Sequence, residues 1–260
     1  MTSPTGHRDA EATRPIPPVS PTVVRALQER AARAFPAVDE SRDGGWWLRH
    51  TTSPSWWLGA TLPHDDGDLD RRVNAAEEFY AERRAVTRFQ ITPGVCAPAL
   101  DPLLARRGYR RELSVELRTA STVDALGPAN GVELSDAPGP AWFGVWRSRH
   151  GGDAEAERAL LARVPAPSAY ALAHRDGVPV AVGRCVAEDG WAGVFGMVTL
   201  PGEQGRGAGR AILAALAGWA AGRAATGMFL QVTADNAGAR RLYERAGFTT
   251  AAVFHYRVGD

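Results

Sequence analysis

The pattern of apolar and polar residues predicts helices and strands along both halves of the chain. Val23, Leu27 and Ala31 recur at helical spacing after Ser20-Pro21, a capping residue followed by proline, so we expect a helix to about Phe35. Periodicity and turn residues then predict strands over 46–50, 56–62, 88–92 and 110–117, and helices over 69–84 and 97–107. The segments 46–50 and 56–62 are expected to pair as a β-hairpin.

The second half predicts a meander followed by helices and strands. We expect strands over 132–135, 169–175, 178–187, 191–200, 228–233 and 252–258, and helices over 140–150, 154–164, 208–223 and 236–246. Asp-Gly dipeptides at 176–177 and 189–190 suit tight hairpin turns, which favours an antiparallel arrangement of the strands that flank them. The predicted fold class is α+β, with two halves in tandem, each a mixed, mostly antiparallel sheet flanked by helices.

Changes in composition set the expected domain boundaries. Residues 1–19 hold four prolines among small and polar residues, which predicts a disordered tail. Residues 119–130 are typical of a linker. We therefore expect a first domain over 20–118 and a second domain over 131–260.

Three segments of the first half match segments of the second half in the same order. Residues 61–63, 89–92 and 107–109 correspond to 199–201, 230–233 and 246–248, at offsets of 138, 141 and 139 residues. The nearly constant offset indicates an internal duplication. The first-half counterpart of the glycine-rich turn is LPHDDGDLD, whose carboxylates would repel a phosphate, so the first half is interpreted as a degenerate copy.

Composition excludes several classes of function. The net charge of +1 gives no electrostatic reason to expect nucleic acid or an acidic membrane as partner. All 30 basic residues are arginine, so no Schiff-base or phosphate-loop lysine exists. Two distant cysteines and six scattered histidines favour a cytoplasmic protein without a metal site, and no apolar run is long enough to span a membrane.

Two clusters leave alternatives open. The tryptophans of the first half, together with Trp142 and Trp146, either pack in the core or line an aromatic cleft, and core packing is favoured. Asp65, Asp66 and the neighbouring aspartates at 68 and 70 either begin a helix or bind a metal, and the helix start is favoured.

The stretch from Met197 to Arg210, MVTLPGEQGRGAGR, predicts a strand that runs through a glycine-rich turn into a helix. Such a turn directs free backbone N–H groups at one anion. It is not a nucleotide-triphosphate loop, because Ala208 stands where lysine is required. Nor is it a dinucleotide fingerprint, because Ile212 replaces the last glycine of that motif and the flanking strands predict a meander.

The segment Gln204-Gly205-Arg206-Gly207-Ala208-Gly209 resembles the pyrophosphate motif of the GCN5-related N-acetyltransferase (GNAT) superfamily. Residues 234–248, ADNAGARRLYERAGF, resemble the second signature of that family. The resemblance covers residues 132–258, and the whole chain is similar to tandem GNAT proteins of actinobacteria whose N-terminal half has lost the coenzyme signature.

The resemblance implies acetyl-coenzyme A as donor and assigns roles to main-chain groups. Residues 205–210 would hold the pyrophosphate, with Gln204 in the motif and with Arg206 and Arg210 adding positive charge. The strand edge Met197, Val198, Thr199 and Leu200 would pair with the pantetheine arm, and a backbone N–H near Met197 or Val198 would stabilise the oxyanion.

The resemblance assigns two side chains on one helix face. Asn236 would cap the helix or bond the coenzyme arm, and Tyr243 would be the general acid for the departing thiolate. The general base stays open among His150, Glu188, Asp189, His255, a water chain, or an amine that arrives neutral.

The expected activity is acetyl transfer to a primary amine by direct attack in a ternary complex. A small-molecule acceptor is favoured over a protein lysine or N-terminus because a cleft is expected between the halves. The alternative is a non-catalytic acyl-coenzyme A-binding or regulatory protein. A monomer or a homodimer is expected.

Overall fold

The computed structural model describes residues 19–121 and 129–260 of the chain. Almost all of the predicted disordered tail, and residues 122–128 of the predicted linker, lie outside the described residues. Residues 119–121 were wrongly placed in the linker, because strand β5 continues through them to Ser121.

Secondary structure follows the predicted order with few exceptions. The helices are α1 (Pro21–Arg33), α2 (Leu69–Glu82), α3 (Leu100–Arg106), α4 (Pro140–His150), α5 (Ala154–Ala162), α6 (Ala208–Ala221), α7 (Ala237–Arg245) and the short 3₁₀ helix η1 (Trp56–Gly59). The strands are β1 (Asp39–Asp43), β2 (Trp46–His50), β3 (Leu62–Pro63), β4 (Arg88–Ile91), β5 (Arg110–Ser121), β6 (Val132–Ser135), β7 (Ser168–Arg175), β8 (Val178–Glu188), β9 (Trp191–Thr199), β10 (Gly227–Thr233) and β11 (Thr249–Val258).

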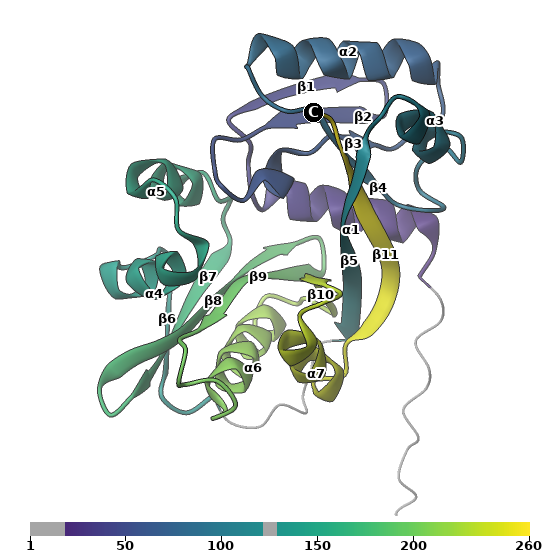
Figure 1. Ribbon diagram of the computed structural model, residues 1–260. Coiled ribbons are helices and arrows are strands. Elements are labelled where there is room, and N and C mark those ends of the chain that lie inside the picture. The colour runs from purple at the N-terminus through teal and green to yellow at the C-terminus, as the bar shows by residue number, and fades with distance from the viewer. Residues whose placement is uncertain (1–18, 122–128) are drawn as a thin grey trace, which may run out of the picture.

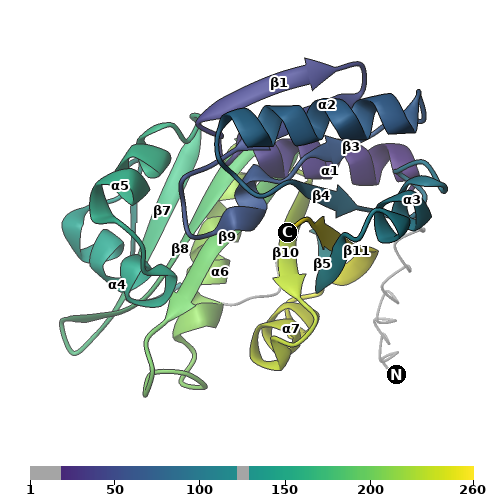
Figure 2. The same ribbon diagram turned by 45° about the horizontal axis from the view of Figure 1, so that its top comes forward.

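Strands of both halves share one large sheet. The eight-stranded sheet has the order β4-β11-β5-β10-β9-β8-β7-β6, and a three-stranded sheet has the order β1-β2-β3. Pairing is antiparallel except between β9 and β10. In Figures 1 and 2 the dark teal β5 lies beside the yellow β11. The expectation of a separate sheet in each half was therefore wrong, because β4 and β5 join the strands of the second half.

The two halves nevertheless repeat one order of elements. In each half a meander is followed by a helix, a strand parallel to the last meander strand, a second helix and a final antiparallel strand. The parallel contact is β9–β10 in the second half and the isolated bridge Thr61–Phe89 in the first. The final strands are exchanged, because β5 pairs with β10 and β11 pairs with β4. Neither half can complete its sheet without the other.

The predicted hairpin between 46–50 and 56–62 was right only at its end. β2 pairs antiparallel with β3, where Trp47 lies opposite Leu62, but it pairs over more of its length with the polar segment β1 across the turn at Gly44, and most of the second segment forms η1. Trp56 packs edge-on against Tyr256 at 5.2 Å between ring centroids, so a contact with the last strand fixes η1. β1 escaped prediction because its sequence, DESRD, has no apolar residue.

Helix α1 joins the halves. Val24, Leu27 and Ala31 pack in a cluster with Val115, Leu117 and residues of β9 and β11. At the C-terminal end of α1, Arg49 of β2 donates to the carbonyls of Ala32 and Phe35, and Arg184 of β8 donates to that of Ala34. A helix C-terminus carries partial negative charge, so buried cations from both halves hold this end of α1.

Candidate active site

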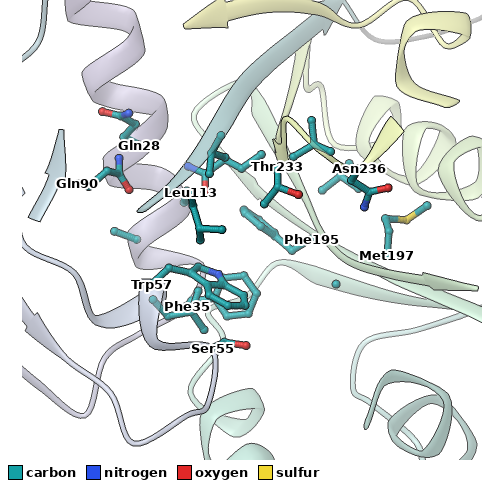
Figure 3. A pocket seen from close by; sticks show the side chains of 18 of the residues that line it. Gln28, Phe35, Ser55, Trp57, Gln90, Leu113, Phe195, Met197, Thr233 and Asn236 are labelled. Atoms are coloured by element: carbon teal, nitrogen blue, oxygen red, sulfur yellow. The ribbon is translucent and has the colours of Figure 1, made fainter. Parts of the chain in front are cut away.

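One cavity of about 370 Å³ lies at the junction of the two halves. β9 and β10 pair in parallel only from Trp191 and Gly227 to Val194 and Leu230, after which both strands continue without pairing to each other. The parts of β9 and β10 that no longer pair with each other line the cavity. Helix α7 lines it on one side, and α1, β2 and η1 line it on the other. Figure 3 shows Met197 and Asn236 at the end of the cavity away from Gln28 and Gln90.

A bulge in β9 shapes the wall at Met197. The register between β8 and β9 shifts between Val182 and Arg184, and Gly196 has φ +60°. A Cβ at Gly196 would lie 3.1 Å from Nε1 of Trp146, so glycine lets the strand approach α4 closely.

The pairing of β9 with β8 decides which of its main-chain groups face the cavity side. The Leu200 N–H donates to Val180, and Val198 pairs with Val182, so these two residues direct their main-chain groups toward β8. Because bonding directions alternate along a strand, Met197 and Thr199 direct theirs to the open edge. Of the four predicted strand residues, these two are therefore placed to bond a ligand through the main chain.

The glycine-rich turn ends at the N-terminus of α6, as predicted. Gly207 is the N-cap with φ +91°, and Gly202 and Gly205 also have positive φ. The first-turn N–H groups, on Ala208, Gly209 and Arg210, have no acceptor within the helix. Gln204, Gly205 and Arg206 are exposed beside them, as is the Arg210 side chain. The turn thus presents free donors at the positive end of a helix dipole.

An ion pair between two residues of the second half supports this turn. Arg175 of β7 pairs with Glu203 and also donates to the Arg206 carbonyl at 3.0 Å. Glu203 also accepts from the Arg206 guanidinium at 3.0 Å. Arg175 therefore braces the main chain, and the charge of Arg206 is partly offset.

Tyr243 and Asn236 both line the cavity from α7, the arrangement that their spacing predicts. Tyr243 is buried, and among the described residues no hydrogen bond to its hydroxyl is present. Burial raises the pKa of Tyr243 to about 12, so the phenol keeps its proton at neutral pH. The Asn236 Oδ1 accepts from the Ala239 N–H at 3.1 Å, which confirms capping and leaves the amide NH₂ for a ligand.

Of the four base candidates, His150 alone lines this cavity in the described part of the chain. Its Nδ1 lies 2.9 Å from the Trp146 carbonyl, which only accepts, so Nδ1 carries the hydrogen and Nε2 has a lone pair. Burial lowers the pKa of His150. The ring stacks on Trp146 at 4.4 Å, and Trp146 in turn lies against Gly196, next to Met197.

The other three candidates are paired elsewhere. Glu188 bonds Arg33 at 2.8 Å, and Asp189 bonds Arg30 at 3.4 Å. His255 Nε2 lies 2.9 Å from Asp101. The structure places none of them beside Tyr243.

The tryptophans divide between core and cavity. Trp46 and Trp142 are buried in separate core clusters, and Trp56 packs against Tyr256, so the cleft interpretation was wrong for these three. Trp146 lines the cavity as proposed, and so does Trp57.

First-half residues that the sequence did not single out also line the cavity. They include Gln28, Arg49 and Gln90. No local motif identifies them, because they reach the cavity through the exchange of strands and the position of α1.

The aspartate cluster begins a helix. Asp68 caps α2 by accepting from the Arg71 N–H, Asp65 pairs with Arg72, and Asp70 pairs with Arg107. Across residues 19–121 and 129–260, no three acidic, histidine or cysteine side chains gather as metal ligands would. Within the same ranges, every helix is too short or too polar to cross a bilayer.

The sequence matches, over residues 22–257, the family described as "Probable histone acetyltransferase Rv0428c C-terminal". The chain belongs to this family. The matched region includes both halves and the whole cavity, so the family shares more than the coenzyme motif.

Named relatives and solved structures agree with this assignment. The "Uncharacterized N-acetyltransferase YobR" of Bacillus subtilis is 25% identical over 248 residues, which cover 90% of this chain and 98% of YobR. A "GCN5-related N-acetyltransferase from Kribbella flavida" has a similar fold, with a TM-score of 0.70 and 19% identity over 91% of this chain and 94% of that one.

A "Tandem GNAT protein from the clavulanic acid biosynthesis pathway" covers 95% of this chain and 89% of its own length, with a TM-score of 0.60 and 13% identity. The protein is therefore an acetyltransferase with a GNAT fold.

Proposed function

We propose that the protein transfers an acetyl group from acetyl-coenzyme A to a primary amine by direct attack in a ternary complex. One observation carries the proposal: the open edge of β9 leads from Met197 into the free N–H groups of α6, and the same cavity holds Tyr243. This continuous surface suits an extended ligand with an amide-bearing arm and a pyrophosphate.

The donor is held mainly by main-chain groups. The N–H groups of residues 205–210 bind the pyrophosphate at the N-terminus of α6, with Arg210 adding charge. Main-chain groups of Met197 and Thr199 pair with the pantetheine amides as a neighbouring strand would. The Asn236 NH₂ bonds the same arm while its oxygen caps α7.

Two neutral side chains and one N–H serve the transfer step. The amine nitrogen forms a bond to the acetyl carbon while the carbon–sulfur bond breaks. His150 Nε2 accepts the proton that the amine loses, and Tyr243 donates a proton to the departing thiolate. The Met197 N–H bonds the developing oxyanion.

The chain descends, in this proposal, from a duplicated GNAT domain. The repeated order of elements and the exchanged final strands support duplication, as does the similarity to a tandem GNAT protein. In the first half Asp68 caps the helix that corresponds to α6. A carboxylate at that position excludes a second anion, so one donor site per chain is expected.

Two assays test the proposal. Calorimetric titration should show one acetyl-coenzyme A per chain, and thiol release should then follow addition of an amine from a panel. Incubation of cell extract with isotope-labelled acetyl-coenzyme A, followed by mass spectrometry, covers acceptors outside the panel. Absence of acetyl-coenzyme A binding would contradict the proposal. Binding without transfer to any panel or extract component would favour the non-catalytic alternative.

A further inference from the structure

The charge of the cavity wall bears on the acceptor. Within the described part of the chain, no aspartate or glutamate lines the cavity, and Arg49 is the one lining residue with a permanent charge. The remaining polar groups are amides, hydroxyls and the His150 ring. A cationic acceptor would find no counter-ion in this lining.

Arg49 is buried with hydrogen-bonding capacity to spare. The residue is 3% exposed, and its Nη2 donates to the carbonyls of Ala32 and Phe35 at 2.8 and 2.6 Å. Its Nε has no hydrogen-bond partner and lies 3.7 Å from the half-exposed Glu40, and no hydrogen bond involves Nη1 among the described residues. Unsatisfied donors on a buried cation favour an anionic ligand.

A second buried cation strengthens the positive field. Arg184 is fully buried, lies over the rings of Phe35 and Phe195, and also bonds the end of α1. Its Nε and Nη1 have no hydrogen-bond partner. At hydrogen-bond distance only carbonyl oxygens contact the two guanidinium groups within the described residues, and the carboxylate of Glu40 lies farther away, at 3.7 Å from Arg49 Nε.

The walls next to Arg49 are apolar. Phe35 follows α1, Leu62 lies on the strand paired with β2, and Trp57 lies on η1. Gln28 and Gln90 add buried amides at this end, and Gln28 Oε1 and Gln90 Nε2 have no hydrogen-bond partner.

We propose that the acceptor is a primary amine that carries a carboxylate on an apolar or aromatic body, and that Arg49 binds the carboxylate. The amine then points along the cavity toward His150 and Met197. This inference rests on the proposed function, because it names the acceptor class for the same site. It disfavours polyamines and also histones, which the family's description names, because both would bring positive charge to Arg49.

A charge series of small probes tests the inference without knowledge of the true acceptor. The probes are 3-phenylpropanoate, 3-phenylpropanamide and 3-phenylpropylammonium, titrated into the full chain with tryptophan fluorescence or calorimetry as readout. The carboxylate should bind about tenfold more tightly than either analogue, because a charge-assisted hydrogen bond replaces a neutral contact. Equal or tighter binding of the ammonium probe, or failure of all three to bind, would overturn the inference.

Variants of Arg49 test whether this residue causes the preference for the carboxylate probe. Arg49→Gln should remove the preference for the carboxylate, and Arg49→Lys should keep part of it. Arg42→Gln is the control, because Arg42 also stacks on Trp47 but is exposed on β1 and does not line the cavity. A folded Arg49→Gln protein with unchanged carboxylate selectivity would contradict the assignment. If Arg49→Gln unfolds, the probe series is compared between the wild type and Arg49→Lys, and that comparison decides whether Arg49 binds the carboxylate.

Titration of acetyl-coenzyme A into the same proteins separates the two proposals. Normal coenzyme binding without carboxylate selectivity contradicts the acceptor class alone, whereas absent coenzyme binding contradicts the proposed function.

Discussion

Burial sets the protonation of both side chains that would transfer protons. Desolvation disfavours charge, so it raises the pKa of Tyr243 to about 12 and lowers the pKa of His150. At neutral pH the phenol is a donor and the imidazole an acceptor. Burial therefore keeps a proton donor, Tyr243, and a proton acceptor, His150, available in one cavity.

Replacement of Tyr243 by phenylalanine should lower kcat about 100-fold, the size expected for loss of a general acid. The acetyl-coenzyme A Kd should stay within about threefold, because the hydroxyl binds no other group of the described chain. Steady-state kinetics and calorimetry measure the two effects. Tyr170→Phe removes a buried hydroxyl away from the cavity and should leave both unchanged. Unchanged turnover in Tyr243→Phe would rule out the acid role.

Replacement of His150 by glutamine should lower kcat/KM and change its pH dependence. Only neutral His150 accepts a proton, and its lowered pKa places the acidic fall in rate below the usual histidine range. Protonation of His150 should therefore lower the wild-type kcat/KM only below about pH 6.5, and this decrease should be absent from the variant. His174→Gln, on β7 outside the cavity, should keep the wild-type profile. An acidic limb that persists in His150→Gln would assign it to another group.

At the level of elements, one strand and one helix make the proposed donor site. β9 supplies its open edge because it diverges from β10 after Val194, and α6 supplies free N–H groups because the chain enters it through Gly207. Gly183 lets β9 and α6 pack closely, because a Cβ there would lie 2.5 Å from Met197 Sδ and 2.7 Å from Ile212. Under the proposed function, backbone conformation should therefore matter more to donor binding than side-chain identity.

Replacement of Gly207 by alanine tests this dependence on the backbone. The glycine has φ +91° with no atom within 4 Å of the added Cβ, so the change brings backbone strain of about 1 kcal/mol without a clash. Relief of strain would turn the first N–H groups of α6 and raise the acetyl-coenzyme A Kd about tenfold by calorimetry. Gly202→Ala is the matched control, because Gly202 has φ +83° and open space around the added Cβ. It should raise the acetyl-coenzyme A Kd less than Gly207→Ala does. Equal effects in the two variants would contradict the role of Gly207.

At the level of the whole molecule, exchange of the final strands makes the halves interdependent. β5 of the first half lies between β10 and β11 and pairs with both over most of its length. Arg49 and Arg184 hold the end of α1 from opposite halves. The cavity at this junction therefore exists only in the complete chain.

A protein containing residues 129–260 alone should fail to fold cooperatively, because loss of β5 leaves β10 and β11 unpaired and exposes the α1 contacts. Thermal unfolding followed by circular dichroism checks this. Co-expression with residues 1–121 should restore a stable complex that binds acetyl-coenzyme A. A cooperatively folded second half that binds the coenzyme with full affinity would contradict the interdependence.

The sequence by itself determined the identity and order of most elements and the glycine-rich turn before α6. Ser20-Pro21 predicted the start of α1, the Asp-Gly turns predicted hairpins, and the glycine pattern predicted the turn that opens α6. These features depend on neighbours within a few residues, where periodicity and side-chain caps act. The polar strand β1 and the helix η1 escaped prediction because contacts with distant segments, rather than their own pattern, fix them.

Only the tertiary structure decided how the halves combine and which residues share the cavity. It exchanged β5 and β11, brought His150 but not the other three candidate residues to the cavity, and brought Arg49 to the cavity wall. These outcomes depend on pairs of residues tens to hundreds of positions apart, whose meeting depends on competition among sheet edges and buried surfaces. Local pattern predicts that a strand forms, but it carries no information about which distant edge that strand completes.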